Sequence, residues 1–207
     1  ILKKVGRYNK FGSQQELIEK LSNAIKILPN ISIDLIFNFP FQTKEQLLTD
    51  IRIAQELKPQ QITFYPLMKS PLTRDAIAKS LGVSDEDREL EFYKIITEEF
   101  KDCTQNNAWA FSKNSSTTLV DEYVCSNSDY VGIGSGAFSF LDGRLMINAF
   151  NLKEYEEKIK AGKSPVIGTC DFGRKETLQY VFLTKLFDGE LDIAGFNREN
   201  SANIKKD

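Results

Sequence analysis

One acidic side chain lies in an otherwise apolar segment of the chain. Asp34 stands within residues 33–37, where its neighbours are Ile, Leu and Phe. A carboxylate buried in such a strand destabilises the fold by several kcal/mol unless it is paired or bound. Ligands of parallel βα arrays collect beyond the carboxyl ends of the strands, so Asp34 could meet a polar ligand there, or it could bond to a neighbouring loop. Arg7 could pair with Asp34, clamp a ligand carboxylate with its two-pronged guanidinium, or be an ordinary surface residue.

Three glycines at every second position could bring the backbone close to a ligand. Gly132, Gly134 and Gly136 have no Cβ to keep a planar or phosphate-bearing molecule away. Their spacing differs from the Gly-x-Gly-x-x-Gly dinucleotide motif, and no long helix follows directly. Tight backbone packing or bulges would explain the run equally well. Tyr65 and Pro66, at the end of a predicted strand, could offer a stacking surface, or Tyr65 could be a core aromatic residue.

The composition excludes several classes of chemistry. The 207 residues contain no histidine, which excludes Ser-His-Asp and Cys-His catalysis and imidazole metal sites within them. Cys103, Cys125 and Cys170 are 22 and 45 positions apart, which matches no zinc, Cys-x-x-Cys or iron-sulfur spacing. We expect them to be reduced thiols in a cytosolic protein. This chain is therefore expected to supply neither a catalytic residue nor a metal ligand.

Charge and hydropathy also limit the partners. Lys and Arg total 27 against 29 Asp and Glu, a net charge of -2, so a nucleic-acid surface is not expected. The apolar stretches are well short of the roughly 20 residues that cross a bilayer, so no membrane span is expected. The chain begins with neither Met nor an apolar leader, and we interpret it as a piece of a longer protein.

The elements that must position Asp34 form two βα units. Capping boxes that begin at Ser13 and Thr43 predict helices that end at Pro29 and Lys58. Residues 31–37 predict a strand covered on both faces, because the segment is almost continuously apolar. This alternation predicts parallel strands with right-handed crossovers. The other elements expected in this half are a strand at 61–65, a short helix at 72–81, an acidic helix at 84–103, a strand at 109–111 and a further strand at 119–124.

A different pattern follows the glycine run. Asp142-Gly143 between apolar residues predicts a β-hairpin, and helices are expected from Asn151 to Gly162 and over residues 175–187. We therefore predict two domains: residues 1–112, with the later βα units of a barrel, and residues 113–207, with the glycine run and an α+β domain.

Three segments together resemble the oxygen-independent coproporphyrinogen III oxidase family of radical S-adenosylmethionine (SAM) enzymes. They are residues 33–43, the strand end Phe64-Tyr65-Pro66-Leu67, and residues 130–139, in matching order and separation. Residues 148–168 resemble the part that follows the glycine run in those proteins, so the resemblance covers nearly the whole chain. It implies an α/β fold, with the second half of a partial (β/α) radical SAM barrel of parallel strands and a smaller α+β C-terminal domain.

The resemblance also implies cofactors. Such proteins carry a Cys-x-x-x-Cys-x-x-Cys loop that holds a 4Fe-4S cluster, and the cluster cleaves SAM reductively. None of the three cysteines lies at that place, so SAM and the cluster are expected in the full-length protein, with the cluster ligands outside this chain. By the same resemblance, four positions fall where the family contacts SAM: Arg7, Asp34, the backbone at Pro66, and Phe138. Gly134 and Gly136 are expected to approach the same molecule.

The chain departs from the family pattern at three places. Asn38-Phe39-Pro40 stands where members usually have Gly-Leu-Pro, and Phe138 stands where many have histidine. Members also often have a His-Asn pair before the glycine run, which this chain lacks. Haem ligation through imidazole is therefore not expected here.

Two functions of different classes follow from the resemblance. The first is a fragment of a radical SAM oxidoreductase that acts on a porphyrin or haem-type tetrapyrrole through a 5'-deoxyadenosyl radical, the fragment itself being inactive. The alternative is a non-catalytic haem- or tetrapyrrole-binding or trafficking protein on the same fold. A third interpretation is a βα-rich domain whose glycines and Asp34 serve packing alone. The expected partners are the tetrapyrrole, an electron donor and a second copy bound through an exposed barrel face, in the cytoplasm.

Overall fold

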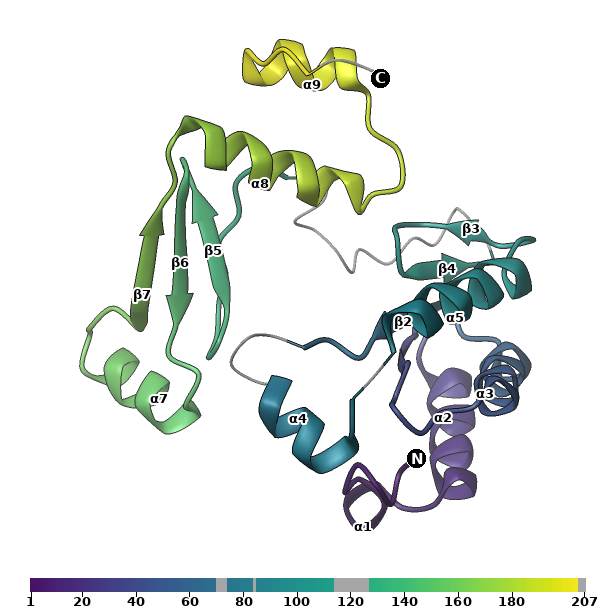
Figure 1. Cartoon of the computed structure of the whole chain (residues 1–207). Helices are drawn as coiled ribbons and strands as arrows, with labels where there is room; N and C mark the ends of the chain where they lie inside the picture. The colour runs from purple at the N-terminus through teal and green to yellow at the C-terminus, as the bar shows by residue number, and fades with distance from the viewer. Residues whose placement is uncertain (70–73, 84, 114–126, 205–207) are drawn as a thin grey trace. The chain divides into compact units, whose positions relative to one another are not determined.

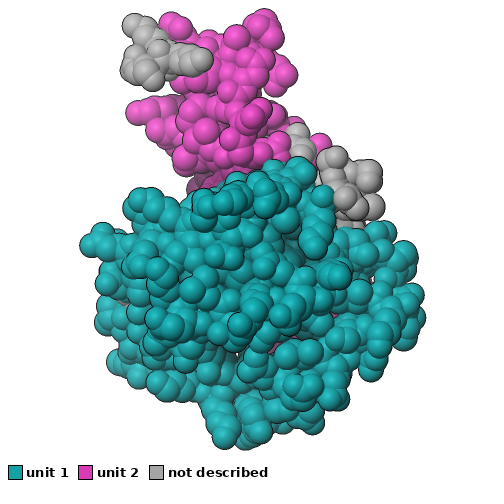
Figure 2. Space-filling view, turned by 90° about the vertical axis from the view of Figure 1, so that its right-hand side faces the viewer, with its two compact units in different colours: residues 1–120 teal, residues 121–207 magenta. Residues whose placement is uncertain are grey.

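The computed structural model describes residues 1–69, 74–83, 85–113 and 127–204. The chain divides into two compact units, residues 1–120 and 121–207, which are coloured separately in Figure 2. The strand expected at residues 119–124 lies outside the described residues.

The first unit contains a four-stranded sheet in the order β1-β2-β4-β3 (Figure 1). Strand β1 (Ser32–Phe37) is parallel to β2 (Gln61–Pro66), which confirms the predicted βα pairing. Strand β4 (Ala110–Ser112) is antiparallel to both β2 and β3 (Thr104–Gln105). The reversal occurs between β3 and β4, where Asn107 Oδ1 accepts hydrogen bonds from the Trp109 and Ala110 amides at 2.8 and 2.9 Å.

Both predicted capping boxes form. Ser13 and Glu16 cap α2 (Gln14–Ile27), and Thr43 and Gln46 cap α3 (Lys44–Leu57). A short helix, α1 (Tyr8–Phe11), precedes them, and α4 (Arg74–Leu81) and α5 (Glu86–Glu99) follow β2. Helices α3 and α5 cover one face of the sheet, and the buried core between them consists of Phe37, Leu47, Ile51, Ala54, Ile62, Phe64, Phe92, Ile96, Phe100 and Phe111.

The expectation that β1 is covered on both faces is wrong for the described part of the chain. Ile33 and Phe37 are buried, whereas Asp34 is exposed and Ile36 is 43% exposed. Successive strand residues point to opposite faces, and the helices cover the face of Ile33 and Phe37. Buried and exposed side chains thus alternate along β1 despite its apolar sequence, and Ile36 is an apolar residue on the face opposite the helices.

In its described residues, 127–204, the second unit is an antiparallel sheet with three helices. Strands β5 (Phe138–Leu141), β6 (Arg144–Asn148) and β7 (Val166–Asp171) pair in that order. Asp142 and Gly143 both have positive φ, +47° and +75°, which confirms the predicted hairpin turn. Helix α7 (Leu152–Lys160) lies at one end of this sheet and α8 (Arg174–Leu186) at the other, and α9 (Ile193–Asn200) follows (Figure 1).

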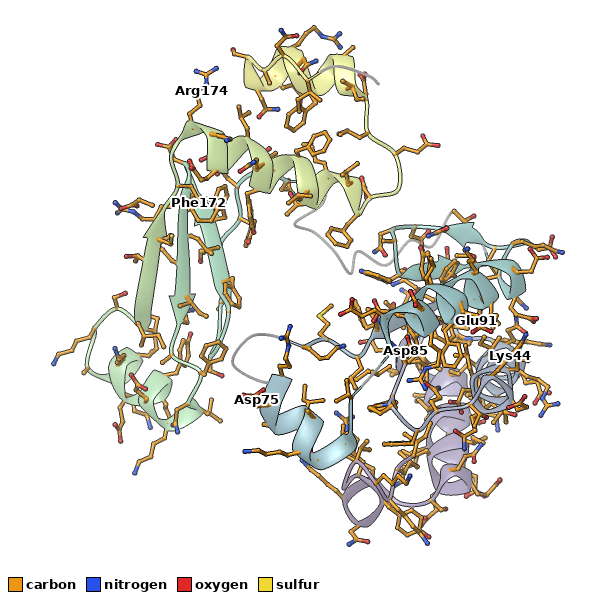
Figure 3. All side chains as sticks on the ribbon, viewed as in Figure 1. Lys44, Asp75, Asp85, Glu91, Phe172 and Arg174 are labelled. Atoms are coloured by element: carbon orange, nitrogen blue, oxygen red, sulfur yellow. The ribbon has the colours of Figure 1, made fainter. Side chains whose placement is uncertain are left out.

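Aromatic residues form the core of the second unit. Tyr130, Phe140, Val181 and Phe196 are buried. Phe172, which lies between β7 and α8 (Figure 3), packs against Phe140 with ring centroids 5.6 Å apart. Within the described ranges of both units, no helix is long and apolar enough to cross a membrane.

A partly buried carboxyl in α3 makes the stability of the first unit depend on pH. Burial raises the pKa of Asp50 above its ordinary value of 3.8. The folded chain therefore binds this proton more tightly than the unfolded chain does. The resulting stabilisation is present below pH 3.8 and is lost as the pH rises through the raised pKa.

We predict that Asp50→Asn is more stable than the unchanged chain at pH 7, because it removes a poorly solvated charge. The difference in unfolding free energy should vanish as the pH falls below 3.8, when the carboxyl is protonated in both states. Urea unfolding, followed by fluorescence of the single tryptophan, measures both values. Glu56→Gln, at an exposed position of the same helix, is the control. An equal gain from the control would show that burial is not the cause.

Candidate functional site

The face of the first sheet opposite α3 and α5 is predominantly polar. Pairing places Ser32 beside Gln61, Asp34 beside Thr63, and Gln61 beside Ser112, so these side chains share one face. Gln61 and Thr63 are fully buried and Ser112 almost so, whereas Asp34 is exposed. Buried polar groups of this kind need hydrogen-bond partners.

Side-chain hydrogen bonds connect the strands across this face. Gln61 Nε2 donates to Ser32 Oγ at 3.4 Å, and Gln61 Oε1 accepts from Asn106 Nδ2 at 3.0 Å. Ser112 Oγ donates to Asn106 Oδ1 at 3.1 Å. We call Ser32, Gln61, Asn106 and Ser112 the polar ladder. It fixes both ends of the Gln61 amide and links β1, β2 and β4 into one rigid surface.

Sequence reasoning missed the polar ladder. The sequence pattern that could have indicated it is a polar residue at every second position, Ser32 and Asp34 in one strand and Gln61 and Thr63 in the next. The two series lie on the same face because the strands are parallel and in register.

Asp34 lies on this face but not in the environment that we expected. Its side chain is exposed, so the expectation that Asp34 is a buried carboxylate in an apolar strand is wrong. Because Asp34 is exposed, its charge stays in contact with water and does not carry the energetic penalty of a buried carboxylate. The carboxylate is accessible beside Thr63, where it could accept hydrogen bonds from a polar ligand.

Pro66 and Arg7 are the other two predicted site residues of the first unit. Pro66 ends β2 and pairs with Phe37, the last residue of β1, so it lies at the carboxyl ends of two parallel strands. Arg7 is exposed and precedes α1, with its guanidinium 5.9 Å from the centre of the Phe11 ring. That contact is a weak cation–π interaction and leaves a ligand role for Arg7 as a prediction.

The departure at Asn38 has a backbone explanation. Asn38 follows β1 with φ of +64°, in the left-handed region that favours glycine and that asparagine enters more easily than other residues. The turn thus keeps the conformation that glycine would permit, while its side chain is fully buried.

The three glycines of the run have different surroundings. A Cβ at Gly132 would lie 2.1 Å from the Phe138 carbonyl oxygen, so this glycine permits backbone contact. A Cβ at Gly136, with φ of +71°, would lie 3.0 Å from the Phe150 ring. A Cβ at Gly134, with φ of +111°, would meet nothing within 4 Å. Packing therefore explains Gly132 and Gly136, whereas the positive φ, and not a lack of space, favours glycine at Gly134.

Polar side chains hold this loop in place. Gly134 N donates to the Tyr155 hydroxyl at 3.2 Å, and its carbonyl accepts from Asn148 Nδ2 at 3.0 Å. Gly132 N donates to Ser139 Oγ at 3.0 Å. Phe138, the first residue of β5, is 44% exposed, and its ring meets the Phe150 ring edge to face at 6.5 Å.

The six predicted site residues fall into two groups of three. Arg7, Asp34 and Pro66 belong to the first unit, and Gly134, Gly136 and Phe138 to the second. Asp34 and Pro66 lie on adjacent strands, and the other group lies within five consecutive residues. That both groups meet one ligand stays a prediction.

The described cysteines do not fit an iron-sulfur cluster. Cys103 is partly buried in the first unit, where burial raises the pKa of its thiol, and Cys170 is exposed on β7. No group of three or more Cys, Asp or Glu side chains within the described ranges could hold a metal ion. Cys125 lies outside those ranges. No reaction step through a cluster can therefore be derived from these residues.

Comparison with known proteins supports the resemblance. No protein-family model matches the chain. The heme chaperone HemW of Bacillus subtilis is 26% identical over 208 residues, which cover 98% of this chain and 53% of that protein. The heme chaperone HemW of Lactococcus lactis is 28% identical over 157 residues, which cover 69% of this chain and 38% of that protein. The chain thus spans about half the length, or less, of these relatives.

A solved structure shares the fold. Coproporphyrinogen III oxidase (HemN) from Escherichia coli, described as a radical SAM enzyme, matches with a TM-score of 0.71 and 15% identity over 97% of this chain and 50% of that one. The predicted α/β class, a partial barrel with a smaller α+β domain, is confirmed by this match. The predicted resemblance to radical SAM proteins of the coproporphyrinogen oxidase type is confirmed with it.

Gly132 provides a test of the packing of the glycine loop. Because its Cβ would lie 2.1 Å from a backbone oxygen, Gly132→Ala should lower the unfolding free energy of the second unit by about 1–3 kcal/mol. Gly168→Ala is the control, since its Cβ would meet a side-chain methyl of Ile147 at 3.1 Å, and a side chain can move. Thermal unfolding followed by circular dichroism measures both. Equal stabilities of the two variants would contradict the close approach.

Proposed function

We propose that this chain is part of a haem-binding protein of the haem chaperone type, built on a radical SAM fold. The observation that carries the proposal is the match to a curated haem chaperone over 98% of the chain. It favours the non-catalytic alternative over the tetrapyrrole oxidoreductase, because the similar oxidase shares the fold at only 15% identity.

The first unit is proposed to contribute to a SAM site. Asp34 offers an accessible carboxylate beside the polar ladder, and Pro66 offers backbone at the end of β2. These groups fit a ligand with hydroxyl and ammonium groups, since few but well-placed polar atoms orient a small molecule. Bound SAM would supply an adenosyl group that a reduced cluster can release as a radical. In this proposal Asp34 binds SAM, and Arg7 pairs with its carboxylate.

The second unit offers apolar surface for haem. Ile133 is 89% exposed, Phe150 65% and Leu152 69%, and the Phe150 ring packs against Gly136. Large exposed apolar residues can serve as a binding surface when a ligand covers them. Because the 207 residues contain no histidine, the proposed contact is apolar and not an imidazole bond to iron.

The oxidoreductase remains a second candidate because the fold is that of a radical SAM enzyme. Either candidate requires an electron donor for a cluster supplied by other residues, and cysteines with scattered spacing favour the cytoplasm. A second copy could bind at the uncovered face of β1, where Ile36 is exposed.

The complete product of the gene that encodes these residues distinguishes the candidates. It should be prepared anaerobically with a reconstituted cluster, titrated with haem, and assayed with coproporphyrinogen III for 5'-deoxyadenosine release and for decarboxylation of the substrate. A Soret shift without substrate-dependent decarboxylation supports the haem chaperone. Decarboxylation supports the oxidoreductase, and neither response would reject both.

We predict that Asp34→Asn weakens SAM binding in that protein by about tenfold, or about 1.4 kcal/mol, because the amide accepts fewer and weaker hydrogen bonds than the carboxylate. Equilibrium dialysis with labelled SAM measures the effect. Asp75→Asn, at an exposed position of α4 (Figure 3), is the control and should leave SAM affinity unchanged. Unchanged affinity in Asp34→Asn would remove Asp34 from the site.

We predict that Phe150→Ala weakens haem binding by about tenfold, because an exposed aromatic ring contributes about 1–2 kcal/mol of apolar contact. Haem titration at the Soret band measures it. Leu183→Ala is the matched control, since Leu183 is 57% exposed on α8. Equal losses in the two variants would place the haem elsewhere.

A further inference from the structure

The turn after β1 is tied to the first turn of α5 by the side chain of Asn38. This side chain is fully buried, and its Nδ2 donates to the Asp85 carbonyl at 3.0 Å and to Glu89 Oε2 at 3.2 Å. Asp85 is the residue that caps α5, and it is labelled in Figure 3. The left-handed backbone of Asn38 is therefore held by contacts from a helix whose capping residue lies 47 positions later in the sequence.

Arg88 completes this connection from the third position of α5. Its Nε donates to Asn38 Oδ1 at 3.0 Å, its Nη1 to the Pro40 carbonyl at 3.1 Å, and its Nη2 to the Phe39 carbonyl at 2.9 Å. The three donors of one planar guanidinium thus bind three consecutive residues. Lysine cannot reproduce this geometry, because it presents one compact ammonium group instead of a rigid fork.

The turn is also closed by bonds of its own. Phe39 N donates to Gln42 Oε1 at 3.3 Å, and Gln42 N donates to the Phe39 carbonyl at 2.9 Å. Arg88 adds a charged donor to the Phe39 carbonyl and another to the Pro40 carbonyl. Because hydrogen bonds from charged groups are stronger than neutral ones, the guanidinium contributes much of the rigidity of the turn.

This turn determines where the carboxyl end of β1 lies. Asn38 directly follows Phe37. The Phe37 carbonyl accepts a hydrogen bond at 2.9 Å from the amide of Leu67, the first residue after β2. Asp34 lies on the same short strand, and ligands of parallel sheets bind beyond such strand ends. A shift of the turn would move the end of the strand that presents Asp34.

We propose that Arg88 is a positioning residue for the ligand site at the carboxyl end of β1. It does not touch the ligand. It holds residues 38–40 against α5 and so keeps Asp34 and the strand end in the geometry that binds SAM. The inference rests on the proposed SAM site of the first unit.

Three variants of the complete gene product test this role. Arg88→Ala removes all three bonds, Arg88→Lys keeps the charge without the fork, and Arg52→Ala, at an exposed position of α3, is the control. The measurements are SAM affinity by equilibrium dialysis, hydrogen exchange of the amides of residues 38–42, and urea unfolding.

We expect Arg88→Ala to bind SAM about tenfold more weakly and its Phe39 and Gln42 amides to exchange about tenfold faster, with β2 amides unchanged. Arg88→Lys should bind SAM less well than the unchanged protein, and Arg52→Ala should match the unchanged protein. Ethylguanidinium, added at concentrations that do not unfold the protein, should restore affinity in Arg88→Ala. A residue that only stabilises the fold would show no such rescue at constant folded fraction.

The possible failures are distinguishable. If the unchanged protein binds no SAM, the proposed SAM site fails, and the positioning role fails with it. If the unchanged protein binds SAM and Arg88→Ala binds it equally well, only the positioning role is overturned. If Arg88→Ala does not fold, Arg88→Lys decides the question, since it keeps the charge but presents one ammonium group in place of the three donors. Looser attachment of the turn to α5 should then appear in Arg88→Lys as faster exchange and weaker SAM affinity, and normal values of both would overturn the proposal.

Discussion

The first unit depends on one constraint: in the described residues, helices cover one face of its sheet. Phe37, Ile62, Phe64 and Phe111 pack beneath α3 and α5, so their strand neighbours must point to the opposite face. The polar side chains at those positions cannot all form hydrogen bonds with water, because Gln61 is fully buried. The Gln61 amide bonds instead to Ser32 and Asn106, which makes the face opposite these helices both polar and rigid.

Two sets of hydrogen bonds stabilise that face, and they act at different places. The polar ladder fixes the middle of the sheet through the Gln61 and Asn106 amides, each of which uses both its donor and its acceptor. The contacts of Asn38 and Arg88 act at the end of β1. Asp34 lies between the two, on a strand whose register against β2 is continuous from Ser32 to Phe37. A strand held in this way keeps the backbone of Asp34 in one position, so little backbone freedom is lost on binding, which favours affinity.

Local signals in the sequence predicted the elements well where the chemistry was local. The capping boxes at Ser13 and Thr43 and the Asp142-Gly143 turn involve residues within a few positions of one another, and all three form. The environment of Asp34 was predicted wrongly, because an apolar run cannot show which of its residues a distant helix will cover. The link from Asn38 to Arg88 spans 50 positions, and no local pattern indicates it. For the glycine run, spacing alone could not separate Gly132, which permits backbone contact, from Gly134, which faces open space.

The lack of histidine bears on what kind of haem binding the proposed function can involve. An imidazole bond to iron is strong and directional, whereas contact with exposed residues such as Ile133 and Phe150 is non-directional and scales with the apolar area covered. A carrier must release its cargo, and release is faster when affinity comes from apolar contact alone, because most differences in affinity lie in the dissociation rate. An enzyme that acts on a tetrapyrrole must instead hold one reacting carbon within reach of the attacking group, which apolar contact without orienting polar groups does not achieve. In the proposed function, apolar contact through Ile133 and Phe150 would therefore permit release of haem.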